Sequence, residues 1–325
     1  MTIRQPTCLR TVAMPGAMIE ALMNKITEKV PETSVAFSFE LFPPKSDTGN
    51  RNLLTQMQLV ERIKPRALCV TSGAGGTGNN RTLETIKSLE SAGGSNLTAH
   101  LTCVGSTKSQ TQHSLDRYAQ EGIFDIVALR GDLNENHHDL STQDSYGNAT
   151  NLVRGIRNRS DGDQFHVSVA GYPETHPKAT SEKADLENLK GKVNEGADLV
   201  LTQFFFDPTI FFRFIESTDR LGIHVPVVPG IIIASNFHRV FNFAEKCGTH
   251  VPDSIIKKFD EVESGSETAN RIATEITLQQ CSQLLENGIR MFHFYTLNRL
   301  DLVVPVCESI QGDIPSSPKL VSGKP

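Results

Sequence analysis

An alternation of short β-branched or aromatic runs with longer amphipathic segments limits most strongly what this chain can fold into. Such alternation is typical of consecutive strand–helix units in a parallel sheet. Eight runs have the character of strands, at 35–42, 67–72, 97–104, 125–132, 166–172, 199–206, 225–233 and 288–297. Helical patterns lie between or after them, at 52–63, 82–92, 114–121, 151–158, 181–195, 208–221, 235–246, 253–263 and 267–286.

Eight strand–helix units within about 250 residues predict a closed (β/α)₈ TIM barrel. A doubly wound open sheet shows the same alternation, so periodicity alone leaves it as the alternative. We expect a single α/β domain, with an N-terminal helical extension over 1–30, the barrel over 31–311, and a mobile tail rich in Pro, Ser and Lys over 312–325.

Charge and cysteine content exclude several classes of protein. The 32 basic and 37 acidic residues give a net charge of −5, which argues against binding to nucleic acid or to an anionic membrane surface. The six cysteines form no C-x-x-C pair, and the ten histidines lack the spacing of a metal site, so we predict no metal. Because no apolar run approaches a membrane span and no secretion signal is evident, we expect a soluble cytoplasmic protein.

Glu40 is the first candidate for catalysis. Side chains alternate along the first strand, so Phe37, Phe39 and Leu41 share one face and Glu40 points the opposite way, into the barrel. A carboxyl flanked by Phe39, Leu41 and Phe42 is expected to be poorly solvated, which suits a general acid. The alternative is a structural ion pair with a buried lysine or arginine.

Asp132 is the second candidate, because the fourth strand ends in LRGD at the carboxyl edge where barrel enzymes assemble their sites. If Asp132 stays hydrated and ionised while Glu40 stays protonated, the two carboxyls can divide electrostatic and acid roles. The alternative is a loop aspartate beside an ordinary ion pair of Arg130.

Glycines at 73–78 match G-x-G-x-x-G, but they follow the second strand and three residues separate them from the helical pattern. We therefore expect a loop whose amides approach a phosphate or substrate, and not a Rossmann site.

Further polar residues follow the fifth and sixth strands. Tyr172 and His176 belong to the proline-stiffened loop YPETHP, and the next helix carries Asp185, Asn188 and Lys192 at spacings of three and four. These three share one helix face that could bind a polar ligand or could simply be solvated. Gln203 lies among apolar residues in the sixth strand, which makes it a candidate for substrate binding.

Several blocks together resemble the short, bacterial type of methylenetetrahydrofolate reductase. They are FSFELFPP at 37–44, HLTC at 100–103, ALRGD at 128–132, YPETHP at 172–177, TQFFFD at 202–207, PGI at 229–231 and HFYTLNR at 293–299. The resemblance implies a flavin-bearing barrel that reduces 5,10-methylenetetrahydrofolate to 5-methyltetrahydrofolate. It also implies that NADH or NADPH reduces bound FAD in a ping-pong cycle, and we expect a homo-oligomer.

By this resemblance, Glu40 is the general acid that opens the folate ring to a cation, and Asp132 stabilises that cation. Gln203 would contact the pterin and, in the alternate half-reaction, the nicotinamide. Phe243 would pack on the aminobenzoate ring and Arg299 would face the glutamate tail. Arg239 replaces a glutamine of close relatives, and we expect its charge to strengthen binding of an acidic tail.

The resemblance also implies a set of FAD-binding residues. They are Thr71, Ser72, Ala74, His100, Arg130, Gly131, Asp132, Ala149, Tyr172, His176, Ala179, Asp185, Asn188, Gly191 and Lys192. Ser72 departs from the aromatic residue that the family often has there. Two alternatives stay open: another flavin-dependent barrel oxidoreductase, similar to proline dehydrogenase, and a non-catalytic folate-binding subunit.

Overall fold

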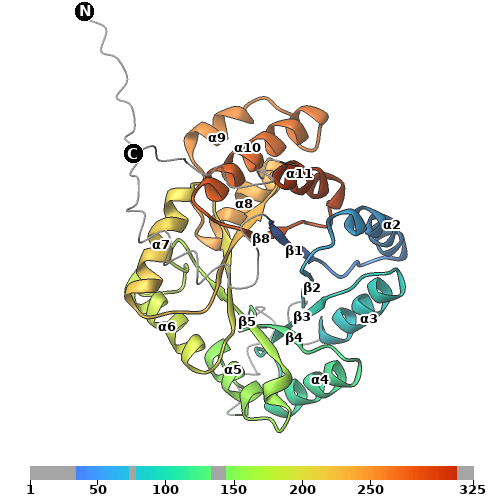
Figure 1. Cartoon of the computed structure of the whole chain (residues 1–325), viewed down its shortest axis with the longest axis vertical. Helices are drawn as coiled ribbons and strands as arrows, with labels where there is room; N and C mark the ends of the chain where they lie inside the picture. The colour runs from blue at the N-terminus through green and yellow to red at the C-terminus, as the bar shows by residue number, and fades with distance from the viewer. Residues whose placement is uncertain (1–33, 73–77, 133–143, 313–325) are drawn as a thin grey trace, which may run out of the picture.

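The computed structural model describes residues 34–72, 78–132 and 144–312. Its eight parallel strands form one closed barrel in chain order, with the helices arranged around the outside (Figure 1). The strands are β1 (Ala36–Leu41), β2 (Ala67–Val70), β3 (Leu97–Thr102), β4 (Asp125–Leu129), β5 (His166–Gly171), β6 (Leu199–Phe204), β7 (Val227–Ile232) and β8 (Met291–Tyr295). Pairing of β8 with β1 closes the ring, so the predicted TIM barrel is confirmed and the open sheet is excluded.

The helices lie at or near the predicted segments. They are α2 (Asp47–Ile63), α3 (Gly78–Ser91), α4 (Lys108–Gln120), α5 (Ala149–Arg157), α6 (Glu182–Asn194), α7 (Pro208–Arg220), α8 (Phe237–Cys247), α9 (Asp253–Lys258), α10 (Glu267–Glu286) and α11 (Leu300–Gly312), with a 3₁₀ turn η2 (Gly162–Gln164) before β5. Polar caps fix several starts: the side chains of Ser46, Asn148 and Ser181 each accept a hydrogen bond from a backbone N–H of the first turn of α2, α5 or α6. The expected extension over 1–30 lies outside the described residues, as does the expected tail over 312–325 except for Gly312, which ends α11.

One helix escaped prediction. Helix α11 contains Pro305, which removes a backbone donor and normally argues against a helix interior. Its buried residues, among them Val304 and Cys307, nevertheless pack the helix beside α2 and α10 (Figure 1). Burial of this apolar face stabilises the helix despite the proline.

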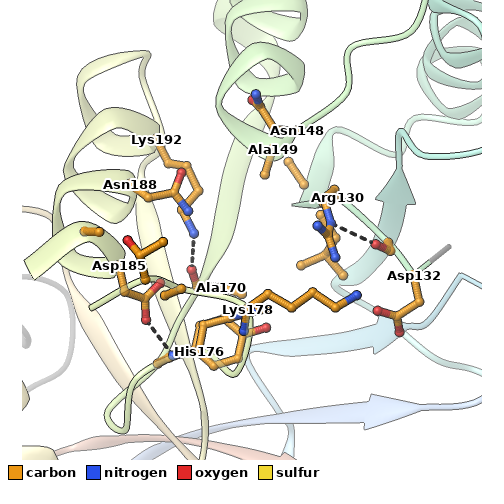
Figure 2. A pocket seen from close by; sticks show the side chains of 17 residues that line it. Arg130, Asp132, Asn148, Ala149, Ala170, His176, Lys178, Asp185, Asn188 and Lys192 are labelled. Carbon is orange, nitrogen blue, oxygen red and sulfur yellow. Dashed lines mark hydrogen bonds between the residues drawn. The ribbon is translucent and has the colours of Figure 1, made fainter. Parts of the chain in front are cut away.

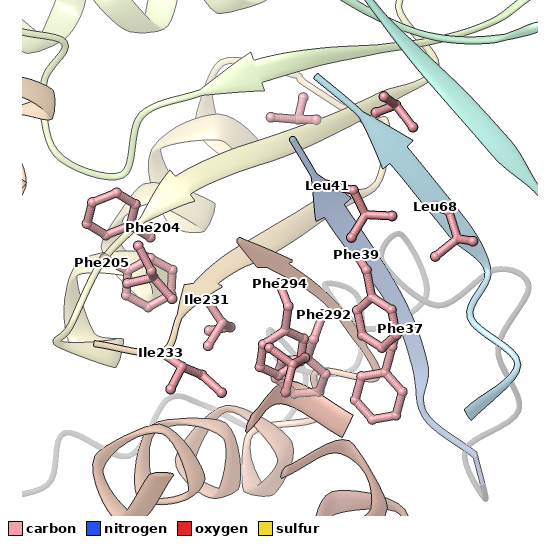
Figure 3. Close-up of a cluster of buried hydrophobic side chains, with 14 of the residues drawn as sticks. Phe37, Phe39, Leu41, Leu68, Phe204, Phe205, Ile231, Ile233, Phe292 and Phe294 are labelled. Atoms are coloured by element: carbon pink, nitrogen blue, oxygen red, sulfur yellow. The ribbon is translucent and has the colours of Figure 1, made fainter. Parts of the chain in front are cut away.

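The core has two parts, set by the alternation of side chains along each strand. Outward-facing residues such as Phe37, Phe39 and Phe292 pack beneath the helices, with the Phe37 and Phe292 ring centroids 6.1 Å apart (Figure 3). A smaller cluster of Val127, Leu199, Leu201, Val228 and Met291 forms a second core. These belong to the inward-facing set of their strands, so apolar contacts fill the lower barrel and polar groups gather at the carboxyl ends.

The carboxyl ends of the strands therefore form the face where loops and polar side chains meet.

None of the helices in the three described ranges is both long and apolar enough to cross a lipid bilayer.

Candidate active site

Glu40 lies inside the barrel at the carboxyl end of β1 and is only 8% exposed. It forms part of the wall of a central cavity of about 710 Å³. Two imidazoles from other strands face its Oε2 atom: His100 Nε2 lies 3.7 Å away and His293 Nε2 lies 3.8 Å away. The Ser38 hydroxyl holds the other side of His293, 2.8 Å from Nδ1. The predicted inward orientation of Glu40 is thus confirmed.

The surroundings of Glu40 differ from those expected from its sequence neighbours. Phe39 and Leu41 point into the outer core, while Phe42 lies exposed at the mouth. The barrel interior itself removes water from the carboxyl. Within the described ranges no lysine or arginine forms an ion pair with Glu40, which argues against the structural ion-pair alternative.

His100 does not compensate Glu40 as a permanent cation would. Burial lowers the pKa of His100 to about 4, so this ring is neutral at pH 7. Neither His100 Nε2 nor His293 Nε2 has a hydrogen-bond partner in the described part of the chain. Buried polar atoms are normally paired, so these two nitrogens are available to groups that enter the cavity.

A second cavity of about 470 Å³ lies beside β4, β5, the start of α5 and one face of α6 (Figure 2). Ten of the predicted FAD-binding residues line this second cavity: Arg130, Gly131, Asp132, Ala149, Tyr172, His176, Ala179, Asp185, Asn188 and Lys192. Asn148, Lys178 and Thr180 also line it, although the sequence did not single them out. Leu129, Asp132, Ala170 and Tyr172 line both cavities, so the two adjoin.

The predicted common face of α6 is confirmed, because Asp185, Asn188 and Lys192 all line this second cavity. Lys192 is 6% exposed and its Nζ donates to the Ala170 carbonyl at 2.5 Å (Figure 2). Burial lowers the pKa of Lys192 to about 8. This face of α6 is therefore not simply exposed to solvent, because it places the buried ammonium of Lys192 against the cavity.

The loop after β5 is held by hydrogen bonds. The His176 N–H donates to Asp185 Oδ2 at 2.9 Å, and the Lys178 N–H donates to His176 Nδ1 at 3.0 Å. The Tyr172 and His176 rings meet edge to face with centroids 4.5 Å apart. Burial raises the pKa of Tyr172 to about 12, so it presents a neutral phenol. These contacts fix the wall that the two cavities share.

Gly131 shapes the exit from β4. Its φ of +84° is in the left-handed region, and a Cβ there would lie 2.9 Å from Thr102 Cβ. Only glycine fits without strain, and this turn brings Arg130 and Asp132 to the cavity wall. Arg130 Nε donates to the Gly131 carbonyl at 3.2 Å, and the Asp132 side chain is exposed.

Residues predicted to bind the substrate divide into two groups. Gln203, Arg239 and Phe243 line the central cavity, and the Gln203 side-chain carbonyl accepts from the Phe204 N–H at 3.0 Å. Arg299 does not line it: its Nε and Nη2 atoms hydrogen-bond to Asp301 at 2.9 Å and 2.8 Å. The structure therefore separates Arg299 from the other three.

Two aromatic rings mark the mouth of the central cavity. Phe42 and Phe243 are 38% and 39% exposed, and they are the exposed large hydrophobic side chains of the described ranges. Phe243 also contacts Phe204, with ring centroids 5.4 Å apart. Exposed apolar surface at a cavity mouth is typical of a binding site for an aromatic ligand.

The other predicted FAD-binding residues lie in different places. Thr71, Ser72 and His100 line the central cavity. Gly191 lines neither cavity and faces Thr150 of α5. Ala74, with the glycine motif up to residue 77, lies outside the described residues.

Sequence reasoning missed His293 and Tyr295 as site residues, although both belong to the recognised block HFYTLNR. Pairing of Ser38 with His293 and of Glu40 with Tyr295 places them on the same inward face. Alternation along β8 would have indicated this. Across residues 34–72, 78–132 and 144–312, no group of three His, Cys, Asp or Glu residues is arranged to hold a metal ion.

Comparison with known proteins identifies relatives over most of the chain. The profile of the family described as methylenetetrahydrofolate reductase matches residues 24–311. The 5,10-methylenetetrahydrofolate reductase of Pectobacterium carotovorum subsp. carotovorum is 36% identical over 291 residues, covering 90% of this chain and 94% of the relative. The Escherichia coli (strain K12) enzyme of the same name is 34% identical, covering 90% and 95%. Methylenetetrahydrofolate reductase (NADH) 1 of Arabidopsis thaliana is 33% identical over 287 residues, or 85% of this chain and 48% of the plant protein.

Among solved structures, an uncharacterised Clostridium thermocellum protein that binds two copies of 5-methyl-5,6,7,8-tetrahydrofolic acid superposes with a TM-score of 0.60. It covers 91% of this chain and 99% of its own, at 12% identity, so it supports the fold alone. The sequence matches support membership of a family as well as the fold, because they extend over nearly the whole barrel at above 30% identity. On that evidence this chain belongs to the methylenetetrahydrofolate reductase family.

Proposed function

We propose that this protein reduces 5,10-methylenetetrahydrofolate to 5-methyltetrahydrofolate, using bound FAD that is reduced by NADH or NADPH. Family membership supports the overall reaction. The observation that carries the mechanism is Glu40, a desolvated carboxyl at the wall of the central cavity, flanked by imidazoles rather than by a lysine or arginine.

The second cavity has the residues that a flavin dinucleotide requires. Its diphosphate is anionic, and the cavity is lined by the side chains of Arg130, Lys178 and Lys192. Its sugar hydroxyls need polar partners, which Asp185 and Asn188 supply. The adjoining central cavity holds the unpaired nitrogens of His100 and His293. These residues fit FAD.

When bound, a flavin supplies the hydride transfer between nicotinamide and folate. The protein supplies the proton: Glu40 holds it at a carboxyl oxygen and delivers it to the folate nitrogen that leaves when the five-membered ring opens. Asp132 lines both cavities, and the negative charge of its carboxylate stabilises the cationic folate that results. Gln203 and Phe243 orient the pterin and aminobenzoate rings against Glu40.

Nicotinamide and folate would occupy the same central cavity in turn, which is the arrangement that a ping-pong cycle needs. The buried floor of the central cavity excludes water from the reacting atoms. In this scheme Glu40 acts only when folate is present, because reduction of a flavin by NAD(P)H requires no proton from an acid at that position.

The absorption spectrum of the purified protein tests this proposal. We expect flavin bands that bleach when NADH or NADPH is added without oxygen, and that return when 5,10-methylenetetrahydrofolate is added. A colourless protein that binds folate would support the non-catalytic subunit. Bleaching by proline, with no reoxidation by folate, would support the other flavin oxidoreductase.

Lys192 gives the proposal a pH dependence. A nearby diphosphate favours the charged ammonium, so flavin binding raises the Lys192 pKa, which burial lowers to about 8 against the opposing effect of Asp185. Above that pH the apoprotein must take up a proton to bind FAD, and the Kd is expected to rise by about tenfold between roughly pH 7 and pH 9.5. Titration of apoprotein with FAD, followed by flavin fluorescence, measures this.

The Lys192→Met variant is the control for this pH dependence. The variant lacks the titrating group, so its Kd for FAD should be higher than the wild-type Kd at neutral pH and nearly constant over the same pH range. An unchanged pH slope in the variant would mean that another group controls flavin binding.

A further inference from the structure

The turn that follows β8 has a strained backbone. Leu297 and Asn298 are consecutive and have φ values of +50° and +58°, in the left-handed region. Asparagine is tolerated there, whereas a bulky residue such as leucine is an outlier. The other non-glycine residues with positive φ in the described ranges, Lys64, Asn96 and Glu261, occur singly. Strain of this kind persists only where the surrounding structure holds it, and it gathers at functional sites.

The side chain of Asn298 holds this turn against the end of β1. The Phe42 N–H donates to Asn298 Oδ1 at 2.8 Å, and Asn298 Nδ2 donates to the Phe42 carbonyl at 2.9 Å. One side-chain amide thus binds both polar backbone groups of Phe42, as a neighbouring strand would in a sheet. We call these two hydrogen bonds the Asn298 clamp.

Neighbouring hydrogen bonds connect the clamp to Glu40. The Thr296 hydroxyl donates to the Glu40 carbonyl at 2.6 Å and accepts from the Asn298 N–H at 3.1 Å. The paired residues of β1 and β8 end at Glu40, so these contacts join the two segments beyond the last strand pair. On the β2 side, the Thr71 N–H donates to the Leu41 carbonyl at 2.9 Å. The backbone that follows Glu40 is therefore held from both sides.

The position of the Glu40 carboxyl depends on this backbone. His100 Nε2 and His293 Nε2 lie 3.7 Å and 3.8 Å from Glu40 Oε2, which is beyond hydrogen-bond distance. Neither imidazole therefore fixes the carboxyl directly. A general acid must come within hydrogen-bond reach of the atom that it protonates, and a misplacement of about 1 Å can cost about 10²-fold in rate.

Resting on the proposed function, we propose that Asn298 is a positioning residue for folate reduction. Its clamp fixes the end of β1, and the end of β1 in turn sets where the Glu40 carboxyl lies in the central cavity. Leu297 and Asn298 themselves line that cavity. The strain at these two residues is the consequence of bringing the Asn298 amide onto the backbone of Phe42.

Asn298→Gly tests the inference, because glycine adopts positive φ freely and removes only the clamp. The turn keeps other anchors: the Thr296 hydroxyl still accepts from the N–H of residue 298, and Gln56 Nε2 donates to its carbonyl at 3.3 Å. We expect reoxidation of the flavin by saturating methylenetetrahydrofolate to slow by about 10–100-fold. Reduction of the flavin by saturating NAD(P)H should keep its wild-type rate. Anaerobic stopped-flow absorbance measures both steps.

A double-mutant cycle shows whether Asn298 acts through Glu40. In the Glu40→Gln background the acidic proton is already absent, so Asn298→Gly should slow the folate step little further. An equal fold-loss from Asn298→Gly in both backgrounds would mean that the two residues act independently, and this result would overturn the inference.

Asn96→Gly is the matched control. Asn96 also has a left-handed backbone, with φ of +53°, and its Nδ2 donates to the Pro65 carbonyl at 3.2 Å. It lies directly before β3, at the amino-terminal end of the strand and away from both cavities described above. Both steps should run at wild-type rates in this variant, so a slowed folate step there would show that loss of any such amide has the same effect.

Asn298→Asp provides a second variant if Asn298→Gly does not fold. Aspartate still accepts from the Phe42 N–H but cannot donate to the Phe42 carbonyl, so the folate step should again be the slower one. An equal loss of both steps would assign Asn298 a structural role only, and a raised KM for folate with an unchanged saturating rate would assign it to binding. Either result overturns the inference while leaving folate reduction by the wild type intact. A wild-type protein that reduces no folate would instead contradict the proposed function.

Discussion

Replacement of Glu40 by glutamine is expected to preserve flavin reduction by NAD(P)H and to lower the rate of folate reduction by about 10²–10⁴-fold, the range that a general acid contributes. Glutamine keeps the size of the side chain and its place between His100 and His293, but it carries no acidic proton. Anaerobic stopped-flow absorbance separates the two steps, since NAD(P)H bleaches the flavin and methylenetetrahydrofolate restores its colour.

Glu174→Gln provides the matched control for this experiment. Glu174 is also partly buried near the carboxyl ends of the strands, and its Oε1 accepts from the His250 N–H at 2.9 Å, a bond that glutamine can keep. It lines neither cavity, so both steps should proceed at wild-type rates. An equal loss of both steps in Glu40→Gln would show that Glu40 has a structural role only.

The largest expected effect on stability is that of Gly230→Ala. A Cβ on Gly230 would lie 2.2 Å from the Thr202 carbonyl oxygen and 2.6 Å from Tyr295 Cε2. Neither neighbour can move freely, because the Tyr295 hydroxyl donates to that same carbonyl at 2.8 Å. We expect the free energy of unfolding to fall by about 3 kcal/mol, the upper end for overpacking, as measured by urea denaturation.

Gly191→Ala adds the same methyl group but is expected to change the free energy of unfolding in the opposite direction. The nearest atom to its Cβ would be Thr150 Cγ2 at 3.7 Å, an ordinary contact, and Gly191 lies inside helix α6. Alanine is favoured over glycine there, so stability should rise by about 0.5–1 kcal/mol. Destabilisation of similar size in both variants would contradict the steric explanation.

The alternation of residue types determined the order of strands and helices in this chain and the face that each strand residue takes. A period of two along β1 placed Glu40 inward, and a period of three to four placed Asp185, Asn188 and Lys192 together on α6. Both periods are local properties of a strand or helix, so sequence alone is sufficient. Helix α11 was missed because the local signal of Pro305 opposed the burial that stabilises it.

The tertiary structure alone decided which side chains meet. His100 and His293 flank Glu40 only because β3 and β8 curve to the same interior in the closed ring, and no local pattern links residues so far apart in the chain. In the same way, the ion pair of Arg299 with Asp301 became visible only in the structure. Strand register and barrel closure depend on contacts between residues far apart in the chain. These contacts decide which of the inward-facing side chains meet in the site, and local sequence patterns do not.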